Sequence, residues 1–303
     1  MTNSSATGES RDRPVHIPVL LRETLQALEL TPGLIVVDGT VGAGGHSTEI
    51  LKRIGPTGQL IGIDRDPMML QFAANRLSTP NCHLIQDTYA HLPQILAGLG
   101  LPAVDRILVD LGLSSDQLSD RERGFSFQSD GPLDLRFDPS QGRSAADWLA
   151  DVELAELTEI LERYAEEPRS AALARALIQA RQKEPIRTAH QLAEIIAHSG
   201  LARASQEHQR HPATRVFQAL RLVVNQELEQ VEQLVHHVAA QCLKPGGRLV
   251  VITFHSLEDR LVKHAFREET LWQPTPKPVA ASTAEQRLNP RSRSALLRAA
   301  TRK

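Results

Sequence analysis

Several features that would assign a protein to a membrane or to secretion are missing from this chain of 303 residues. No apolar run approaches the roughly 18–20 residues that are needed to cross a bilayer. Residues 1–14 are polar and lack the apolar segment of a signal peptide. We therefore expect a disordered N-terminus over residues 1–14, no membrane partner and a cytoplasmic protein.

Cysteine is scarce, and no spacing typical of a metal site is present. The two cysteines, Cys82 and Cys242, are far apart in the sequence, which favours reduced thiols over a disulfide. The 12 histidines include no His-Glu-x-x-His pattern and the cysteines no Cys-x-x-Cys pattern, so we expect no metal ion. The net charge is only −2, and any contact with a nucleic acid must therefore come from a local patch of basic residues.

The sequence does contain a glycine-rich turn between an expected strand and an expected helix, within residues 35–53. β-branched residues lead into Asp38, and the glycines of the turn follow directly. Backbone N–H groups in such a turn can approach a ligand closely. A second expected strand, residues 60–64, ends in Asp64 about 20 residues after the turn, where an acid usually holds the two hydroxyl groups of a ribose. Together these features predict a site for a nucleoside cofactor.

The turn differs from two familiar phosphate-binding turns. Position 47, where the dinucleotide pattern Gly-x-Gly-x-x-Gly would need glycine, is Ser47, and no lysine follows the glycines as in a P-loop. Asp38 leads into the turn, and an acid there suits a ligand with a cationic end better than a pyrophosphate. S-adenosylmethionine carries an ammonium and a sulfonium group, so we expect it as the cofactor.

Strands and helices alternate over the first part of the chain, which predicts a doubly wound, parallel α/β sheet. Further strands are expected at residues 82–85, 104–109 and 248–254. Asp38, Asp64 and Asp110 each end a strand, and ligands of such sheets bind at the carboxyl ends of the strands. Asp87 or Tyr89, after the third strand, is expected near an adenine ring.

Residues 121–212 have a different pattern. They begin with a long loop that is punctuated by glycine and proline and carries aromatic residues, and they continue as helical stretches without strands. We therefore expect an all-α insert over residues 121–212, within a discontinuous α/β domain made of residues 15–120 and 213–303. Apolar residues at helical spacing predict one long helix over residues 214–238.

Two polar segments near the C-terminus are candidates for function. A cluster that includes His255 and Asp259 follows the fifth expected strand, and helix capping and a functional role are equally supported for it. Residues 286–303 contain six basic and no acidic residues. Their basic run includes Arg291 and Arg293 and carries donors of the kind that hold nucleic-acid phosphates.

Six motifs follow one another along the chain: Asp38-Gly-Thr-x-Gly-x-Gly-Gly-His46, Asp110-Leu-Gly-Leu-Ser-Ser115, Arg123-Gly-Phe-Ser-Phe127, Phe217-Gln-Ala-Leu-Arg221, Phe254-His-Ser-Leu-Glu-Asp-Arg260 and Asn289-Pro-Arg-Ser-Arg-Ser294. In this order they resemble the signatures of the ribosomal RNA small subunit methyltransferase H family. The resemblance implies a Rossmann-like class I methyltransferase domain with an inserted all-α domain. It also implies methylation, from S-adenosylmethionine, of N4 of a cytidine in the decoding centre (P site) of 16S rRNA.

The resemblance further implies functional residues, position by position. The implied cofactor-binding residues are Gly44, Gly45, His46, Asp64, Tyr89, Asp110 and Gln117. Tyr89 stands where phenylalanine is usual in the family, which keeps a ring face for stacking. We expect the loop after residue 121 to hold an unstacked cytidine, because enzymes that modify a base must expose it. The substrate-side residues of this loop are Phe125, Phe127, Asp134 and Arg136.

The reaction makes demands that the sequence can meet. A cytosine amine is a poor nucleophile because its lone pair is delocalised into the ring, so direct attack needs alignment and an acceptor for the amine proton. Asp110 is our first candidate for the acceptor, with His255 and Asp259 as alternates. Methylation at carbon 5 would need a cysteine nucleophile, and neither Cys82 nor Cys242 occupies a position typical of a site.

Two other functions stay open. Another S-adenosylmethionine-dependent enzyme, acting on amines of DNA or protein, would share the cofactor half but would leave the motifs of the insert and the tail unexplained. A non-catalytic RNA-binding assembly factor would have no need for the complete set of strand-terminal acids. The sequence is compatible with naked 16S rRNA or the 30S subunit as substrate, and with a monomer or a homodimer.

Overall fold

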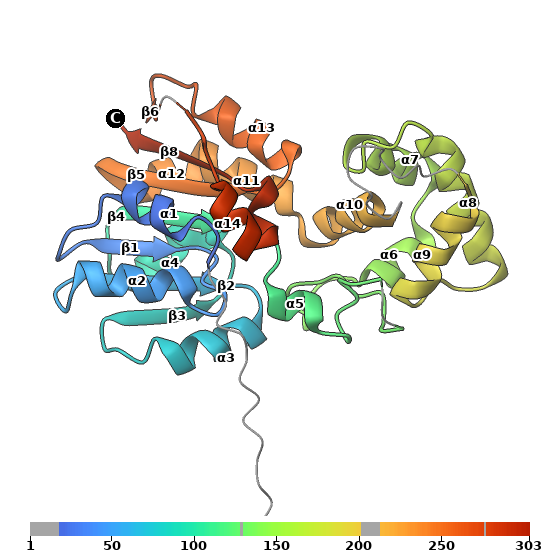
Figure 1. Cartoon of the computed structure of the whole chain (residues 1–303), viewed down its shortest axis with the longest axis horizontal. Coiled ribbons are helices and arrows are strands. Elements are labelled where there is room, and N and C mark those ends of the chain that lie inside the picture. Colours follow the sequence, from blue (N-terminus) through green and yellow to red (C-terminus); the bar gives the residue numbers. More distant parts are fainter. Residues whose placement is uncertain (1–17, 128–129, 201–212, 276) are drawn as a thin grey trace, which may run out of the picture.

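The computed structural model describes residues 18–127, 130–200, 213–275 and 277–303. Within them the chain forms an α/β body around one sheet and a cluster of helices beside it (Figure 1). The expected disordered N-terminus, residues 1–14, lies outside the described residues. None of the described helices is long and apolar enough to cross a membrane.

The sheet has eight strands, five of which run parallel. Its spatial order is β3 (Cys82–Gln86), β2 (Gln59–Asp64), β1 (Ile35–Asp38), β4 (Val104–Asp110), β5 (Leu243–Thr253), β8 (Leu296–Arg302) and β6 (Trp272–Pro274). β8 pairs antiparallel with β5, β6 and the short β7 (Val279–Ala280). The strand order reverses between β1 and β4, and the crevice at such a reversal takes the ligand in doubly wound sheets. The expected Rossmann-like fold is confirmed.

Helices cover both faces of the sheet. Successive residues of a strand point to opposite faces, so each strand contributes to two cores. Val37, Ile107 and Val251 belong to one core, and Val36 and Leu108 to another. The first core includes residues of α4 (Leu92–Gly98), α11 (Glu227–Gln233), the π-helical segment Leu234–Val238, α12 (Ala239–Cys242) and α13 (Ser256–Ala265). The second includes residues of α1 (Leu21–Leu28) and α2 (Gly45–Ile54). α3 (Pro67–Arg76) packs near the β3 edge.

The helical cluster has a core of its own. It comprises α6 (Ala145–Asp151), α7 (Leu154–Arg163), α8 (Ser170–Lys183), α9 (Ala189–His198) and α10 (Ala213–Asn225). Phe217 and Leu220 of α10 are buried in it beside Leu161, Leu177 and Leu192. The domain limits that we inferred from the sequence remain a proposal, and this packing favours moving the second one from residue 212 to the end of α10.

The prediction of one long helix over residues 214–238 is wrong. Gln226 has a φ of 52°, which ends α10 and starts α11 in a new direction. One left-handed residue leaves the apolar spacing on both sides intact, so the spacing alone could not reveal the break.

The C-terminal basic segment is built into the fold to a greater degree than its charge suggested. α14 (Thr283–Leu288) and a 3-10 turn, Pro290–Ser294, precede β8, which lies inside the sheet. Arg298 forms two hydrogen bonds with Asp259, of 2.7 and 2.9 Å, and Arg302 donates to the Leu243 carbonyl. These two arginines are therefore occupied within the protein, and β6, β7 and β8 are strands that the sequence analysis missed.

Candidate functional site

A cavity of about 580 Å³ lies at the carboxyl ends of β1, β2 and β4 and extends to the loop after α5 (Ser115–Ser119) and to α10. Its lining from the sheet body, here called the sheet wall, includes Gly39, Gly42, Gly45, His46, Asp64, Tyr89 and Asp110. Its lining from the loop and α10, the insert wall, includes Phe125, Phe127, Leu135, Phe137, Phe217 and Arg221. The cavity therefore joins residues from both halves of the chain.

The glycine-rich turn lies tightly against its neighbours. A Cβ atom on Gly39 would lie 3.0 Å from the Cβ of Tyr89, and one on Gly45 would lie 2.5 Å from the Cγ of Pro18. Gly44 has a φ of 81° and backs onto Leu77 rather than lining the cavity. Side chains at these positions would displace the turn, so backbone atoms are what the turn presents to a ligand.

Asp38 does not take the place that the sequence analysis gave it. Its carboxylate accepts from the Ser47 hydroxyl at 2.7 Å and from the Thr40 N–H at 3.3 Å, and it does not line the cavity. Burial raises its pKa to about 6, against which these two hydrogen bonds act. Asp38 thus ties the turn to α2, and another acid must face a cationic ligand.

Asp64 lines the cavity at the end of β2, and within the described part of the chain its carboxylate accepts only backbone hydrogen bonds. The N–H groups of Gly42 and Asp66 donate to its two oxygens at 2.8 and 2.9 Å. Burial raises its pKa to about 6, and these two bonds lower it in part. Each carboxylate oxygen keeps acceptor capacity, which fits a pair of ribose hydroxyl groups.

Asp110 lines the cavity at the end of β4. Its Oδ1 is buried and has no hydrogen-bond partner among the described residues, while its N–H donates to the Thr40 hydroxyl at 2.7 Å. Burial is the main cause that holds its pKa well above the usual value, and the charges of Asp38 and Glu258 add to it. An unpaired carboxyl of this kind suits a cationic ligand or a proton acceptor.

His46 stands behind Asp110 as a neutral ring. Its Nε2 lies 3.0 Å from the carbonyl of Val19, which can only accept, so Nε2 carries the hydrogen. Nδ1 is left as an acceptor, 3.7 Å from Asp110 Oδ2. Burial lowers the pKa of His46 to about 4. The ring is therefore uncharged at neutral pH and adds no cation beside Asp110.

The other two predicted cofactor residues also line the cavity. Tyr89 is buried in the first sheet core and is also one of the residues that line the cavity. Gln117 closes the capping box of α5 with Ser114, and its amide donates to Asp66 at 2.8 Å. Gln117 is therefore also part of the frame of the cavity.

Only one of the two alternate proton acceptors lines the cavity. His255 does so, but its Nδ1 accepts from the Glu258 N–H at 3.3 Å; its buried Nε2 lies 2.8 Å from Glu258 Oε1 and forms no hydrogen bond with a described residue. It is thus engaged in capping α13. Asp259 is bound by Arg298 and does not line the cavity.

The predicted substrate residues divide in the same way. Phe125 and Phe127 belong to the insert wall, where Phe127 meets Phe217 edge-on with ring centres 5.5 Å apart. Asp134 and Arg136 do not line the cavity and pair with each other at 2.6 Å. Their neighbours in the loop, Leu135 and Phe137, are the residues that face it.

The two arginines of the tail differ from each other. Arg291 donates to the carbonyls of Leu113 and Ser114 at 3.2 and 3.1 Å, which fixes the tail to the segment after β4. Both arginines line the cavity, but Arg291 is half-buried and Arg293 is exposed. Arg293 is therefore the one of the two that is placed to meet an external phosphate.

Two residues of α10, Arg221 and Asn225, belong to the site although they were not among the predicted site residues. Arg221 lines the cavity and forms two hydrogen bonds with Glu227, of 2.8 and 3.0 Å. Asn225 is buried, donates to the carbonyl of Leu135 at 2.7 Å and accepts from the N–H of Phe137 at 2.8 Å. The signature Phe217-Gln-Ala-Leu-Arg221 was the signal that could have found Arg221, whereas Asn225 lies outside it.

These observations define the class of the protein. The strand order, the tight glycine turn, the acceptor pair of Asp64 and the unpaired carboxyl of Asp110 suit a nucleoside with a cationic end. They are the parts of a Rossmann-like class I methyltransferase, and S-adenosylmethionine is its cofactor.

Comparison with known proteins gives the family. Residues 13–303 match the MraW methylase family, and the chain belongs to it. Proteins named "Ribosomal RNA small subunit methyltransferase H" are similar to it over nearly their whole length. The one from Thiobacillus denitrificans is 46% identical, covering 95% of this chain and 97% of its own. Those from Trichlorobacter lovleyi and Shewanella denitrificans are 47% and 41% identical, over 94% and 95% of this chain and 97% of their own.

Proposed function

We propose that this protein methylates 16S rRNA, and that the methyl group goes to the exocyclic N4 of a cytidine in the decoding centre. The names of the relatives support the small-subunit rRNA as substrate. The observation that carries the choice of an amine is Asp110, which lines the cavity between the glycine turn and the aromatic insert wall and whose buried Oδ1 has no hydrogen-bond partner among the described residues. An exocyclic amine needs such an acceptor, whereas carbon 5 of the same base needs a thiolate.

The cysteines argue against the carbon-5 reaction. Cys82 lies in β3 and Cys242 in α12, and neither lines the cavity. Burial raises the pKa of both thiols to about 11, so they are not thiolates at neutral pH. The chain thus lacks the nucleophile for a covalent enzyme–cytosine intermediate.

The residues of the two walls would divide the work. S-adenosylmethionine supplies a methyl group on a positively charged sulfur. Asp64 would hold the ribose, and Tyr89 would offer its ring to the adenine. Phe127 and Phe217 would hold the unstacked cytosine, whose amine then faces Asp110. Alignment of this kind can contribute up to about 7–11 kcal/mol of the barrier.

Asp110 would take the amine proton. The amine nitrogen gains the methyl carbon, the carbon–sulfur bond breaks, and one N–H proton passes to Asp110 and then to solvent. The raised pKa of Asp110 makes it a stronger base than an exposed carboxylate. His255 is the less suitable acceptor, because its Nδ1 lone pair already accepts from the Glu258 N–H and the neutral ring then carries its hydrogen on Nε2. Asp259 is held by Arg298 outside the cavity.

We place the enzyme in the cytoplasm, with 16S rRNA as its partner within the 30S subunit. Arg293, which is exposed and lines the cavity, would contact the RNA backbone. Arg291 would act on the RNA only indirectly, through the position of the tail.

The test is transfer of tritium from labelled S-adenosylmethionine to 30S subunits of a strain that lacks this gene, followed by nucleoside analysis. We expect label in N4-methylcytidine of 16S rRNA, and none with the Asp110→Asn protein. Label in another nucleoside, or in DNA or protein amines, would overturn the substrate. Tight cofactor binding in calorimetry without any transfer would favour the non-catalytic assembly factor.

A further inference from the structure

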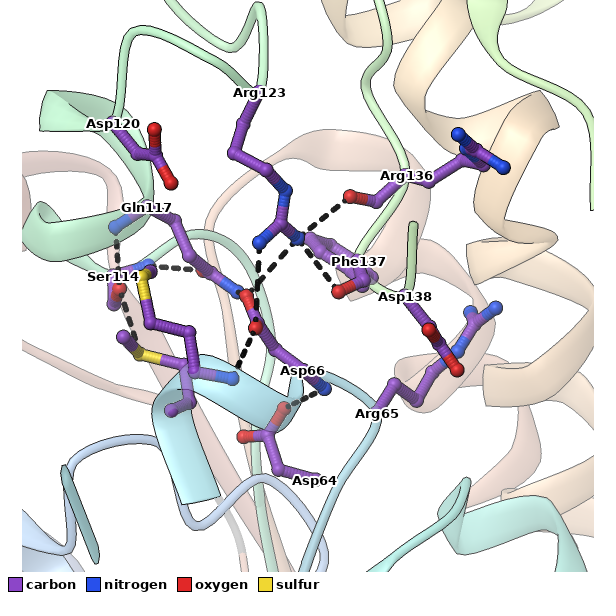
Figure 2. A network of polar contacts seen from close by, with 12 residues as sticks. Asp64, Arg65, Asp66, Ser114, Gln117, Asp120, Arg123, Arg136, Phe137 and Asp138 are labelled. Carbon is purple, nitrogen blue, oxygen red and sulfur yellow. Dashed lines mark hydrogen bonds and ion pairs between the residues drawn. The ribbon is translucent and has the colours of Figure 1, made fainter. Parts of the chain in front are cut away.

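Three consecutive residues at the end of β2, Asp64, Arg65 and Asp66, connect the two walls of the cavity. Asp64 lines the cavity, and the next two residues, Arg65 and Asp66, turn toward the loop after α5 and toward α10 (Figure 2). The N–H of Asp66 donates to Asp64 Oδ1 at 2.9 Å, so the two acids are linked directly. A shift of Asp64 on binding a ribose would therefore be felt by Asp66.

Asp66 is fully buried and binds Arg123, which is also buried. Two nitrogens of the guanidinium lie 3.1 and 3.4 Å from the carboxylate oxygens, and the Gln117 amide donates to the same carboxylate at 2.8 Å. Burying an ion pair costs desolvation free energy, and removing one partner costs more because the other charge is then buried without compensation. An ion pair of this kind is retained where its geometry matters.

The other side of Arg123 holds the substrate loop. The guanidinium Nη2, which lies 3.1 Å from Asp66 Oδ2, also donates to the carbonyls of Arg136 and Phe137 at 2.8 and 2.6 Å (Figure 2). The Arg123 carbonyl accepts from the Leu135 N–H at 3.0 Å. Arg123 thus fixes the backbone that carries two insert-wall residues, Leu135 and Phe137.

The crossing of the two loop segments leaves little freedom. Gly124 has a φ of 68°, and a Cβ there would lie 2.2 Å from the Pro132 carbonyl oxygen. A second link runs from Arg65, which donates to the Asn225 carbonyl at 2.6 Å, to the side chain of Asn225, which binds the backbone of Phe137. These contacts tie residues 123–124 to residues 132–137, and the anchors of both segments are the neighbours of Asp64.

We propose that Arg123 is a positioning residue that couples cofactor binding at Asp64 to the shape of the pocket for the substrate base. It acts through Asp66 on one side and the carbonyls of Arg136 and Phe137 on the other. The inference rests on the proposed function, and it adds that cofactor and RNA bind with positive cooperativity. By thermodynamic linkage, each ligand then raises the affinity of the protein for the other ligand by the same factor.

The experiment measures that factor with unreactive probes. S-adenosylhomocysteine binding is measured by calorimetry, and binding of a 16S rRNA fragment by fluorescence anisotropy, each with and without the other ligand. For the unaltered protein we expect mutual tightening of about fivefold or more, the lower end of ordinary allosteric coupling.

The main variant is the double substitution Asp66→Asn with Arg123→Gln, which removes both charges and keeps hydrogen-bonding groups of similar size. We expect it to abolish most of the cooperativity while S-adenosylhomocysteine alone binds nearly as before. Arg123→Lys, which keeps the charge but loses the planar fork, should weaken cooperativity in the same direction. Arg121→Gln, an exposed arginine two positions away, is the matched control and should keep it.

The outcomes separate the inference from the function on which it rests. Unaltered protein that methylates 16S rRNA but shows no cooperativity would overturn the inference alone, and so would full cooperativity in the double variant. A thermal unfolding curve for each variant shows whether it is folded. A general loss of structure would weaken the binding of each ligand even when it is measured alone. Lost positioning of the loop instead raises KM for RNA more than KM for the cofactor.

Discussion

The charged side chains on the two sides of the cavity differ in whether they are paired within the protein. On the sheet wall, Asp64 is bonded only to backbone N–H groups and Asp110 keeps a buried oxygen without a partner among the described residues. In the loop and α10 that carry the insert wall, Arg136 is paired with Asp134 and Arg221 with Glu227. The comparison indicates that the acids of the sheet wall are there for a ligand, while the charges of the insert side hold the protein together. Recognition of the base would then fall to the aromatic rings.

The largest expected effect tests the acid of the sheet wall. Asp110→Asn should lower kcat by about 100-fold or more, because general-base catalysis typically contributes about 10²–10⁴-fold. Tritium transfer to 30S subunits measures the rate, and calorimetry checks that the cofactor still binds. Asp259→Asn is the matched control, since it removes a carboxylate outside the cavity, and it should act mainly on stability. Full turnover by Asp110→Asn would assign the proton to another group.

The next effect tests the insert wall. Phe127→Ala should raise KM for the RNA by about 5- to 150-fold, because stacking of a base on an aromatic ring contributes about 1–3 kcal/mol. Binding of S-adenosylhomocysteine should stay unchanged. Phe127→Leu keeps most of the apolar volume without the ring and should also raise KM. If the leucine variant behaved like the unaltered protein, Phe127 would serve packing against Phe217 only.

The pH dependence of cofactor affinity tests the role of Asp64 on the sheet wall. Ribose hydroxyls donate to an ionised carboxylate, and burial raises the pKa of Asp64 to about 6. The cofactor therefore binds best above this pH, and affinity should fall by up to about tenfold per pH unit below it, as expected for one proton. The lowered pKa of His46, about 4, leaves it neutral through this window.

Two substitutions show which carboxyl group causes this pH dependence, with cofactor affinity measured by calorimetry between pH 5 and 8. Asp64→Asn should weaken binding and flatten the profile. Asp38→Asn is the matched control, because burial also raises the pKa of Asp38 to about 6 although it does not line the cavity. A profile that Asp38→Asn flattens and Asp64→Asn leaves sloping would move the titrating group to the turn.

The smallest effect compares the two arginines of the tail. Arg293→Gln should reduce the slope of log affinity against log salt by about 1, as for the loss of one phosphate contact. Arg291→Gln should leave this slope unchanged and lower the thermal unfolding midpoint, because Arg291 is bonded to the carbonyls of Leu113 and Ser114. An unchanged slope for Arg293→Gln would place the RNA backbone elsewhere.

Local signals in the sequence were sufficient for the sheet and for most of the sheet wall. The turn between β1 and α2 and the acids Asp64 and Asp110 depend on short stretches in which strand, turn and helix follow directly. The role of Asp38 could not be obtained in this way, because the orientation of its carboxylate depends on a hydrogen bond from Ser47 in the next helix.

The sequence by itself thus determined the class of fold, the glycine turn and the order of the strand-terminal acids, since each depends on neighbouring residues. Only the tertiary structure decided which charges are already used within the protein. Arg298 meets Asp259 across 39 positions, Arg123 meets Asp66 across 57 and Arg291 meets Leu113 across 178. A basic or acidic residue looks the same in a sequence whether its partner is solvent, a ligand or a distant part of the chain. Long-range packing alone brings such partners together, and it leaves Asp110 and Arg293 facing the cavity.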